Sequence, residues 1–526
     1  MNYFCSYLRP SNCFLALSVL MTNCTGIKND KPKNISTNTE KPNIIYILAD
    51  DLGYGDLRSL NPDSRIPTPN MDKIVREGVH FTDAHSSSAV CTPTRYGILT
   101  GRYAFRTRLK NGVLWGYSTS LIEPGRTTVA SFLKEKGYQT ACIGKWHLGL
   151  DWSKKDSTKA IPDVQGGDQI PSNFDDNVDY IKPVKGDPSD HGFDNSLIIP
   201  ASLDMYPYCY IRNGIVVEAP TFYTEGKNQD VDGRGVFWRA GKMSPSFDFF
   251  KVLPTFVDSA CAYISSAGKH NKPFFLYLSL PAPHTPWLPT LEFKGRSSAG
   301  KYGDYVAMVD EMLGKVLETV KNANIDDNTL VIVTSDNGSD WGPSDIEETG
   351  HRANYHFKGQ KADIYEAGHR IPFVARWKGI IPAGLASEEV MCTTDLMGTL
   401  AGMLHQTVPE GAGEDSYNLW PAFVGEVSYS PIREATIHHS LDGFFSIRKG
   451  KWKLTPYLGS GGFTIPKVIK PQKGEAPGTL YDMGKDPQEQ VNLYSQYPDI
   501  VQKLSELLEL YKSQGYSIPP KKTLTH

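Results

Sequence analysis

The 526-residue sequence has few cysteines, no block of charge of one sign and no long apolar run. Its 8 cysteines form no Cys-x-x-Cys pair, which excludes zinc-ribbon and thioredoxin-like sites. With 55 Lys and Arg against 58 Asp and Glu, the formal net charge is −3. Nucleic-acid-binding proteins normally carry a basic face, so we expect no nucleic-acid partner. The length favours one large domain with a smaller one.

The first 42 residues have the composition of an export segment followed by a tether. Arg9 precedes an apolar run over residues 14–21, which is too short to span a bilayer but typical of a signal-peptide core. Cys24 follows and resembles the lipid-modified cysteine of bacterial lipoproteins; the alternative is a plain secretory peptide. Residues 25–42 are polar and predict a flexible tether. We therefore predict a signal peptide over residues 1–24 and an exported protein. It would be periplasmic or a cell-surface lipoprotein in a bacterium and secreted otherwise, with membrane contact only through Cys24.

Two continuous apolar stretches, 43–49 and 330–335, predict strands buried inside an α/β sheet. Each ends in a pair of oxygen-bearing side chains: Asp50 and Asp51 after the first, Asp336 and Asn337 after the second. Open α/β sheets bind ligands at the carboxyl ends of their strands. Adjacent carboxylates repel each other unless a cation neutralises them, and an all-oxygen set suits calcium better than zinc. The alternative at Asp50 is a solvated acidic turn.

Cys91 lies in the stretch Cys-Thr-Pro-Thr-Arg, where Pro93 disfavours helix at the residue before it and the segment 94–100 can begin one. A helix N-terminus favours an anion, and the planar fork of Arg95 suits oxygen anions. The stretch therefore predicts an anion site that holds a potential nucleophile. The alternative is an ordinary buried thiol.

Two further segments carry histidines at strand ends. Lys145 and His147 lie two apart on an extended segment and project to the same side, where they can hold an anion and transfer a proton. His284 lies in Pro-Ala-Pro-His-Thr-Pro after the apolar strand 272–280, and the prolines restrict its backbone. A packed histidine or a surface lysine is the alternative reading for each segment taken alone.

The motifs together resemble the type I sulfatases of the alkaline phosphatase superfamily, from about Lys41 to the end. The resemblance includes Cys-x-Pro-x-Arg with Leu-Thr-Gly, Gly-Lys-Trp-His-Leu-Gly, Pro-His-x-Pro and Thr-Ser-Asp-Asn-Gly. Thr94 stands where serine is usual. The resemblance implies that Cys91 is oxidised to formylglycine by a sulfatase-maturing enzyme, and that one calcium ion is bound by Asp50, Asp51, residue 91, Asp336 and Asn337.

The resemblance also implies the catalytic roles. Lys145 and Lys361 bind the sulfate, His147 acts as the base on formylglycine, His284 protonates the leaving alcohol, and Arg95 positions formylglycine. The implied reaction is hydrolysis of a sulfate ester. A phosphodiester or phosphonate ester hydrolase on the same fold and a non-catalytic sulfoglycan-binding protein are the alternatives.

Residues outside these motifs suggest the substrate. Aromatics beside Asp204 suit sugar recognition, and His351 and Arg352 are further candidates for substrate contact; a structural or solvated loop is the alternative for each. Ser-Leu-Asp-Met around Asp204 resembles enzymes that act on 6-O-sulfated galactose or N-acetylgalactosamine. The predicted partner is therefore a sulfated carbohydrate.

The predicted fold is α/β, with a large mixed β-sheet flanked by helices over residues 43–428. A smaller C-terminal subdomain over residues 429–526 is predicted to contain an antiparallel sheet and a helix from about Pro498 to Gln514. His438 and His439 lie in this subdomain and are candidates to reach the active-site cleft.

Overall fold

The computed structural model describes residues 41–161, 177–229, 233–270, 272–426, 428 and 430–519. The predicted signal peptide, Cys24 and nearly all of the predicted tether lie outside the described residues. From Lys41 onward the chain forms one compact unit. Within the described part of the chain, no helix is both long and apolar enough to cross a membrane.

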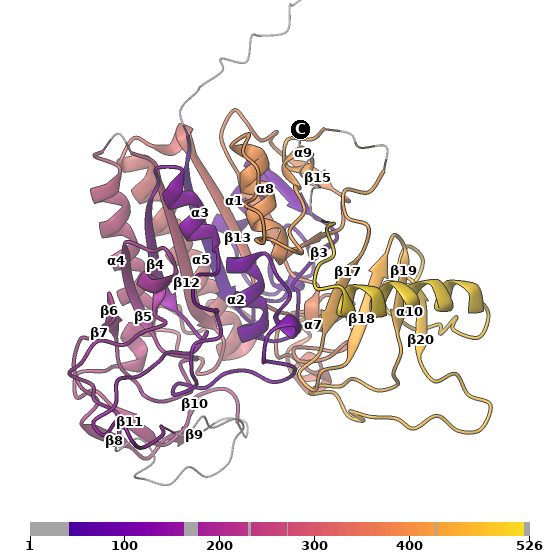
Figure 1. Cartoon of the computed structure of the whole chain (residues 1–526), viewed down its shortest axis with the longest axis horizontal. Helices are drawn as coiled ribbons and strands as arrows, with labels where there is room; N and C mark the ends of the chain where they lie inside the picture. The colour runs from indigo at the N-terminus through magenta and orange to yellow at the C-terminus, as the bar shows by residue number, and fades with distance from the viewer. Residues whose placement is uncertain are drawn as a thin grey trace, which may run out of the picture. The chain divides into compact units, whose positions relative to one another are not determined.

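A ten-stranded mixed sheet forms the centre of this unit (Figure 1). Its strands follow the order β15 (Leu385–Ser387), β2 (Val79–Phe81), β14 (Phe373–Arg376), β13 (Thr329–Ser335), β1 (Asn43–Asp50), β12 (Phe274–Pro283), β4 (Gln139–Lys145), β5 (Asn195–Ile199), β6 (Ile211–Arg212) and β7 (Ile215–Val216). The five strands from β13 to β5 are parallel to one another. All eight residues of β1 are buried, as expected for a strand covered on both faces.

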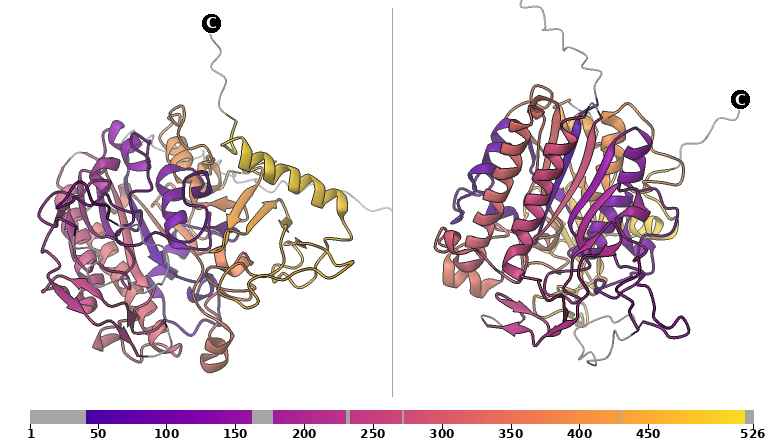
Figure 2. Two further views of the ribbon diagram at one scale, coloured as in Figure 1. Left: turned by 60° about the horizontal axis from the view of Figure 1, so that its bottom comes forward. Right: turned by 90° about the vertical axis from the view of Figure 1, so that its left-hand side faces the viewer.

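Helices cover both faces of this sheet (Figure 2). One face is covered by α1 (Pro69–Glu77), α4 (Val252–Ala267) and α5 (Gly300–Asn322), and the other by α2 (Cys91–Thr100), α3 (Val129–Glu135) and α8 (Leu396–Met403). The side chain of Thr128 accepts a hydrogen bond from the Ser131 amide and so caps α3. In α5 the apolar residues recur at helical spacing and most of them are buried in the core.

Shorter elements fill the connections. They are β3 (Ala84–His85), β8 (Phe222–Thr224), β9 (Lys227–Asn228), β10 (Phe237–Trp238), β11 (Gly241–Met243), β16 (Met391–Cys392), α6 (Pro343–Thr349), α7 (Glu366–His369) and α9 (Trp420–Phe423). The stretch 151–251, which its Gly, Pro and Asp content marks as loop-rich, also supplies β5 to the large sheet. β5 has only five residues between polar turns, so its hydrophobic pattern is too short for the strand to be recognised from the sequence.

The C-terminal part is a four-stranded antiparallel sheet covered by one helix, as predicted. It consists of β17 (Thr436–His439), β18 (Phe445–Lys449), β19 (Trp452–Thr455), β20 (Thr479–Asp482) and α10 (Pro498–Ser513). Figure 1 shows α10 lying across this sheet. Apolar residues of the sheet, such as Ile437 and Leu454, pack with Leu504 and Leu508 of the helix. Because side chains alternate along a strand, the neighbouring His438 and Lys453 lie on the opposite face of the sheet.

Candidate active site

Several of the predicted site residues lie at the carboxyl ends of four adjacent parallel strands. Asp50 ends β1, Lys145 ends β4, Asp336 follows β13 and His284 follows β12. Cys91 is the first residue of α2, so this helix begins at the cysteine itself and not at Thr94 as predicted. Pro93 then lies in the first turn, where its missing N–H has no helical partner to lose.

The five predicted metal ligands converge. The amide of Asp51 donates to Asp336 Oδ1 over 3.2 Å, and Asn337 Nδ2 donates to Asp51 Oδ1 over 2.6 Å. One ligand atom each from Asp50, Cys91 and Asp336 lie within 4.8 Å of one another. Within the described chain, the buried atoms Asp50 Oδ1 and Asn337 Oδ1 have no hydrogen-bond partner. Buried oxygens are normally satisfied, so this set fits a hard divalent cation.

Three cationic side chains face these carboxylates. Lys145 Nζ lies 2.7 Å from Asp50 Oδ2, Lys361 Nζ lies 2.7 Å from Asp51 Oδ2, and Arg95 donates twice to Asp336 Oδ2, over 2.8 and 3.0 Å. Burial, followed by the charge of Asp50, raises the pKa of Asp336 to about 6. For Asp50 itself, Lys145 and its cationic neighbours outweigh burial and hold the pKa well below its usual value. The cluster therefore balances three positive against three negative side chains.

A cavity of about 580 Å³ opens onto this cluster. Five of the residues singled out in the sequence line it: Asp51, Cys91, Asp204, His284 and Lys361. Other loops complete the wall with Asn111, Trp115, Arg234, Arg239, Trp287, Asp340, Asp442 and Phe463. Cations, carboxylates and aromatic rings together suit a polar substrate that carries an anionic group.

The two histidines of the site differ in their environments. His284 lines the cavity, its Nδ1 donates to the Thr285 carbonyl over 2.6 Å, and its Nε2 lies 3.8 Å from Asp51 Oδ2. His147 is fully buried and does not line the cavity. Its Nε2 donates to the Leu114 carbonyl over 2.7 Å, which leaves the lone pair on Nδ1, an atom without a partner in the described residues. Burial holds the pKa of His147 well below its usual value, so the ring is neutral.

The chain resembles known proteins over most of its length. A family model described as Sulfatase matches residues 42–406. An N-acetylgalactosamine-6-O-sulfatase of Bacteroides thetaiotaomicron is 32% identical, over 93% of this chain and 97% of the relative.

The chain belongs to the sulfatase family.

Other sulfatases resemble it over most of their length. Human arylsulfatase A is 29% identical, over 90% of this chain and 88% of its own. A solved Bacteroides thetaiotaomicron structure, described in the context of the metabolism of multiple glycosaminoglycans, superposes with a TM-score of 0.76 at 30% identity. It covers 90% of this chain and 100% of the other. The sulfatase assignment makes the protein an enzyme, a sulfuric ester hydrolase, and confirms the predicted fold class.

Asp204, a predicted substrate contact, lines the cavity of this sulfatase. Burial opposes its ionisation, but Arg239 outweighs burial and lowers the pKa of Asp204 to about 2. The guanidinium of Arg239 pairs with this carboxylate and lies 4.8 Å from the centre of the Trp115 ring. Sequence reasoning missed Trp115 and Arg239, because single residues in irregular loops show no pattern that marks them as neighbours.

The structure places His351 and Arg352 away from the cavity wall. The His351 ring is fully buried, and its Nε2 lies 2.8 Å from Asp56 Oδ1. Arg352 is exposed and is not among the lining residues. His351 thus supports the turn after β1, and its predicted substrate contact has no geometric basis here.

His438 and His439 do not line the cavity either. Both are buried: His438 packs against His85 and His369, and His439 packs against Phe105 and Phe445. The prediction that they reach the cleft is therefore corrected. They contact the catalytic part of the chain through the segment that leads to Cys91.

Proposed function

We propose that this sulfatase removes a 6-O-sulfate from galactose or N-acetylgalactosamine in a sulfated glycan, using formylglycine at position 91 and one calcium ion. The observation that supports the chemistry most directly is the convergence of Asp50, Cys91 and Asp336 within 4.8 Å beside the cavity. The relative named for N-acetylgalactosamine 6-O-sulfate supports the choice of substrate.

Calcium is the cation that this ligand set suits. Asp50, Asp51, Asp336 and Asn337 offer oxygen atoms only, two of which are buried without a hydrogen-bond partner in the described chain. When bound, the ion neutralises these carboxylates and offsets the negative charge of the sulfate oxygens. The ammonium groups of Lys145 and Lys361, which now pair with Asp50 and Asp51, are then available to the sulfate.

The thiol of Cys91 is a poor nucleophile as it stands, because burial raises its pKa. Oxidation to formylglycine by a maturing enzyme, followed by hydration of the aldehyde, supplies a hydroxyl nucleophile at the same position. Arg95 anchors the first turn of α2 through its two hydrogen bonds to Asp336. Nucleophile and carboxylates thereby keep a fixed relative position.

Two histidines are suited to move protons. His284 reaches the cavity with Nε2 while its Nδ1 donates to the Thr285 carbonyl, so a proton taken up by Nε2 is the one that the ring passes to the leaving alcohol. His147 is neutral with its lone pair on Nδ1, so this atom accepts a proton from residue 91. Lys145 and Lys361 hold the sulfate during both transfers.

The sugar is recognised by the loops of the cavity wall. Asp204 stays ionised, and its buried Oδ1 has no partner among the described residues, so it can accept hydrogen bonds from sugar hydroxyls. The Trp115 ring offers an apolar face beside it. Export from the cytoplasm, as the N-terminal sequence predicts, would bring the enzyme to extracellular glycans.

A panel of defined sulfated sugars tests this function. Enzyme with the aldehyde at position 91, verified by peptide mass, is incubated with galactose and N-acetylgalactosamine carrying sulfate at O3, O4 or O6, and with an aryl phosphodiester. We expect sulfate release from the 6-O-sulfated sugars at a kcat/KM at least tenfold above that for the other substrates. Preference for another position would overturn the substrate assignment. Faster phosphodiester cleavage, or binding without sulfate release, would favour one of the alternative functions.

A further inference from the structure

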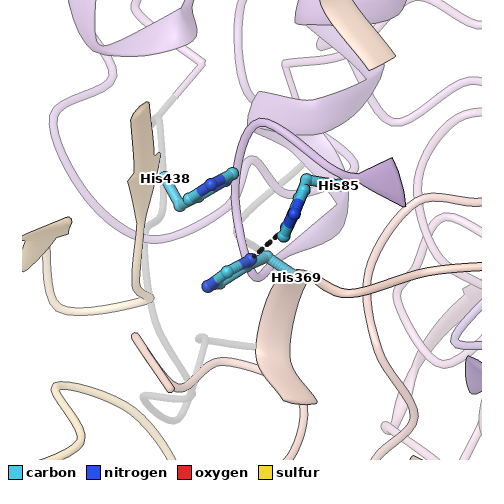
Figure 3. Close-up of side chains that lie close together, drawn as sticks. All are labelled: His85, His369 and His438. Atoms are coloured by element: carbon cyan, nitrogen blue, oxygen red, sulfur yellow. Dashed lines mark hydrogen bonds between the residues drawn. The ribbon is translucent and has the colours of Figure 1, made fainter. Parts of the chain in front are cut away.

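Three histidines from segments far apart in the sequence meet in the interior, outside the cavity (Figure 3). They are His85 of β3, His369 of α7 and His438 of β17, all fully buried. His85 Nδ1 lies 3.0 Å from His369 Nδ1. The rings of His369 and His438 are stacked, with centres 3.9 Å apart and planes inclined by 2°. The cluster joins the inner face of the C-terminal sheet to the catalytic part of the chain.

The hydrogen bonds of the histidine cluster form a chain of donors and acceptors from Lys453 to Asp83. The ammonium group of Lys453 donates to His369 Nε2 over 3.0 Å, so His369 carries its proton on Nδ1 and donates it to His85 Nδ1. His85 in turn donates from Nε2 to Asp83 Oδ1 over 2.7 Å. His438 donates from Nδ1 to the Ser86 carbonyl over 3.0 Å. Each ring is thereby fixed in one neutral tautomer.

The surrounding charges keep the rings neutral. Burial lowers the pKa of all three histidines. The charged groups packed around them are paired among themselves: Asp83 with Arg370 and Arg448, and Lys453 with Glu366 and Glu489. Asp83 and Glu366 favour protonation of His85, but burial and the charge of Arg370 outweigh them.

The ring geometry argues against a metal site, although the three nitrogens lie close together. An imidazole binds a metal along the lone pair in its own plane. His369 and His438 are parallel and stacked, so their lone pairs cannot converge on one ion without rotating a ring. The cluster therefore has a role other than binding an ion.

The histidine cluster and the strand β17 hold residues 86–89, the segment that leads to Cys91. Besides the bond from His438, the Ser86 amide donates to the His369 carbonyl over 2.9 Å, and the Ala89 amide and Ser88 Oγ each donate to the His439 carbonyl over 3.0 Å. The Ser88 carbonyl then accepts from Thr94 Oγ1 in α2 over 3.0 Å. Residues 86–89 are thus fixed by β17 and α7 immediately before Cys91.

We propose that His438, oriented by its stacking on His369, is a positioning residue that holds residue 91 in the geometry needed for sulfate hydrolysis. The C-terminal sheet then contributes to catalysis without touching the substrate. This inference rests on the proposed function of residue 91. A nucleophile displaced by about 1 Å loses on the order of 100-fold in rate, while substrate binding by Lys145 and Lys361 is retained.

Paired amide variants test the hydrogen bond. His438→Asn places an N–H near the position of Nδ1, whereas His438→Gln places it one bond further along the side chain. We expect His438→Asn to keep kcat within about threefold of the wild type and His438→Gln to lose 10- to 100-fold in kcat, with KM changed less than about threefold in both. The matched control is Ser446→Ala, since Ser446 is the partner of His438 in the β17–β18 register and its hydroxyl has no hydrogen bond within the described residues.

Hydrogen exchange provides a readout that does not depend on activity. Amides of residues 86–90 should exchange faster in His438→Gln than in His438→Asn, while amides of β1 and β12 exchange alike in both. Equal kcat in the two variants, or equal exchange over residues 86–90, would overturn the positioning role. A wild-type enzyme that releases no sulfate from any sugar would instead overturn the proposed function, and the exchange comparison would still decide whether His438 holds the segment.

Discussion

Lys145 Nζ lies 2.7 Å from Asp50 Oδ2, and both side chains are almost completely buried. Removing one partner of such a pair leaves an uncompensated charge in the interior, at a cost of roughly 3–5 kcal/mol. The pair survives because Arg95 and Asp336 complete a balanced cluster around it. In the proposed mechanism, a bound cation and the sulfate take the places of these partners.

Lys145→Met is therefore expected to lower both activity and stability. It removes the charge that holds sulfate, so kcat/KM should fall about 100-fold or more. The melting temperature should fall more in chelator than in calcium, because the ion partly neutralises Asp50. Thermal melts with and without calcium, together with sulfate-release assays, check this. Lys503→Met, on the exposed face of α10, is the control and should change neither quantity. An active Lys145→Met enzyme would show that the sulfate lies elsewhere.

Cys91→Ala should abolish sulfate release while the protein stays folded, because one reactive group is lost from the end of a helix. The expected loss of stability is about 1 kcal/mol. Cys142→Ala is a matched control, since Cys142 is an equally buried free thiol in β4. It should show a similar loss of stability with unchanged turnover. Residual activity in Cys91→Ala above the background of the assay would count against residue 91 as the nucleophile.

Calcium should stabilise the folded enzyme. At a free concentration 100 times Kd, binding to the folded state alone adds about 2.7 kcal/mol. We expect chelation to lower the melting temperature, calcium to restore it, and magnesium to restore less of it. Asn337→Ala removes a buried ligand oxygen that has no hydrogen-bond partner in the described chain, and it should lose most of the calcium-dependent shift. The same shift in wild type and Asn337→Ala would place the ion away from this cluster.

Asp204→Asn should impair sugar recognition and leave the sulfate chemistry intact. The amide keeps the shape of the side chain but loses the ionised acceptor beside Arg239. We expect kcat/KM for the sulfated sugar to fall about tenfold or more, and kcat/KM for a small aryl sulfate to change less than about threefold. Equal losses on the two substrates would indicate that Asp204 supports the catalytic groups and does not select the sugar.

His191 should make the fold sensitive to mild acid. Burial lowers its pKa to about 4, against an ordinary value of 6.5. Between these values the unfolded chain binds the proton and the folded chain does not, so stability falls as the pH drops from 6.5 towards 4, by about 1.4 kcal/mol per pH unit. His191→Gln lacks this contribution. Urea unfolding at pH 7, 6, 5 and 4.5 should therefore give a shallower pH dependence for the variant, and parallel curves would refute the assignment.

The strands and helices with strong local patterns could be predicted from the sequence. Residues 43–49 and 330–335 are continuous apolar runs, and the apolar spacing in residues 302–320 fits only a helix. These patterns depend only on residues close together in the chain, so they can be recognised from the sequence alone. The site followed from the same strands, because parallel strands place their carboxyl ends, and hence Asp50 and Asp336, at one edge of the sheet.

The sequence by itself determined the sulfatase motifs and the strands at whose carboxyl ends these motifs lie. Tertiary structure alone decided that Trp115 and Arg239 share a cavity wall with Asp204, that His351 supports a turn, and that His438 stacks on His369 beneath the segment leading to Cys91. These contacts join residues that are far apart in the sequence, from 35 positions for Arg239 and Asp204 to 295 for His351 and Asp56, and most of them lie in irregular or short elements. No local periodicity encodes such pairings, because they arise only when separate layers pack together.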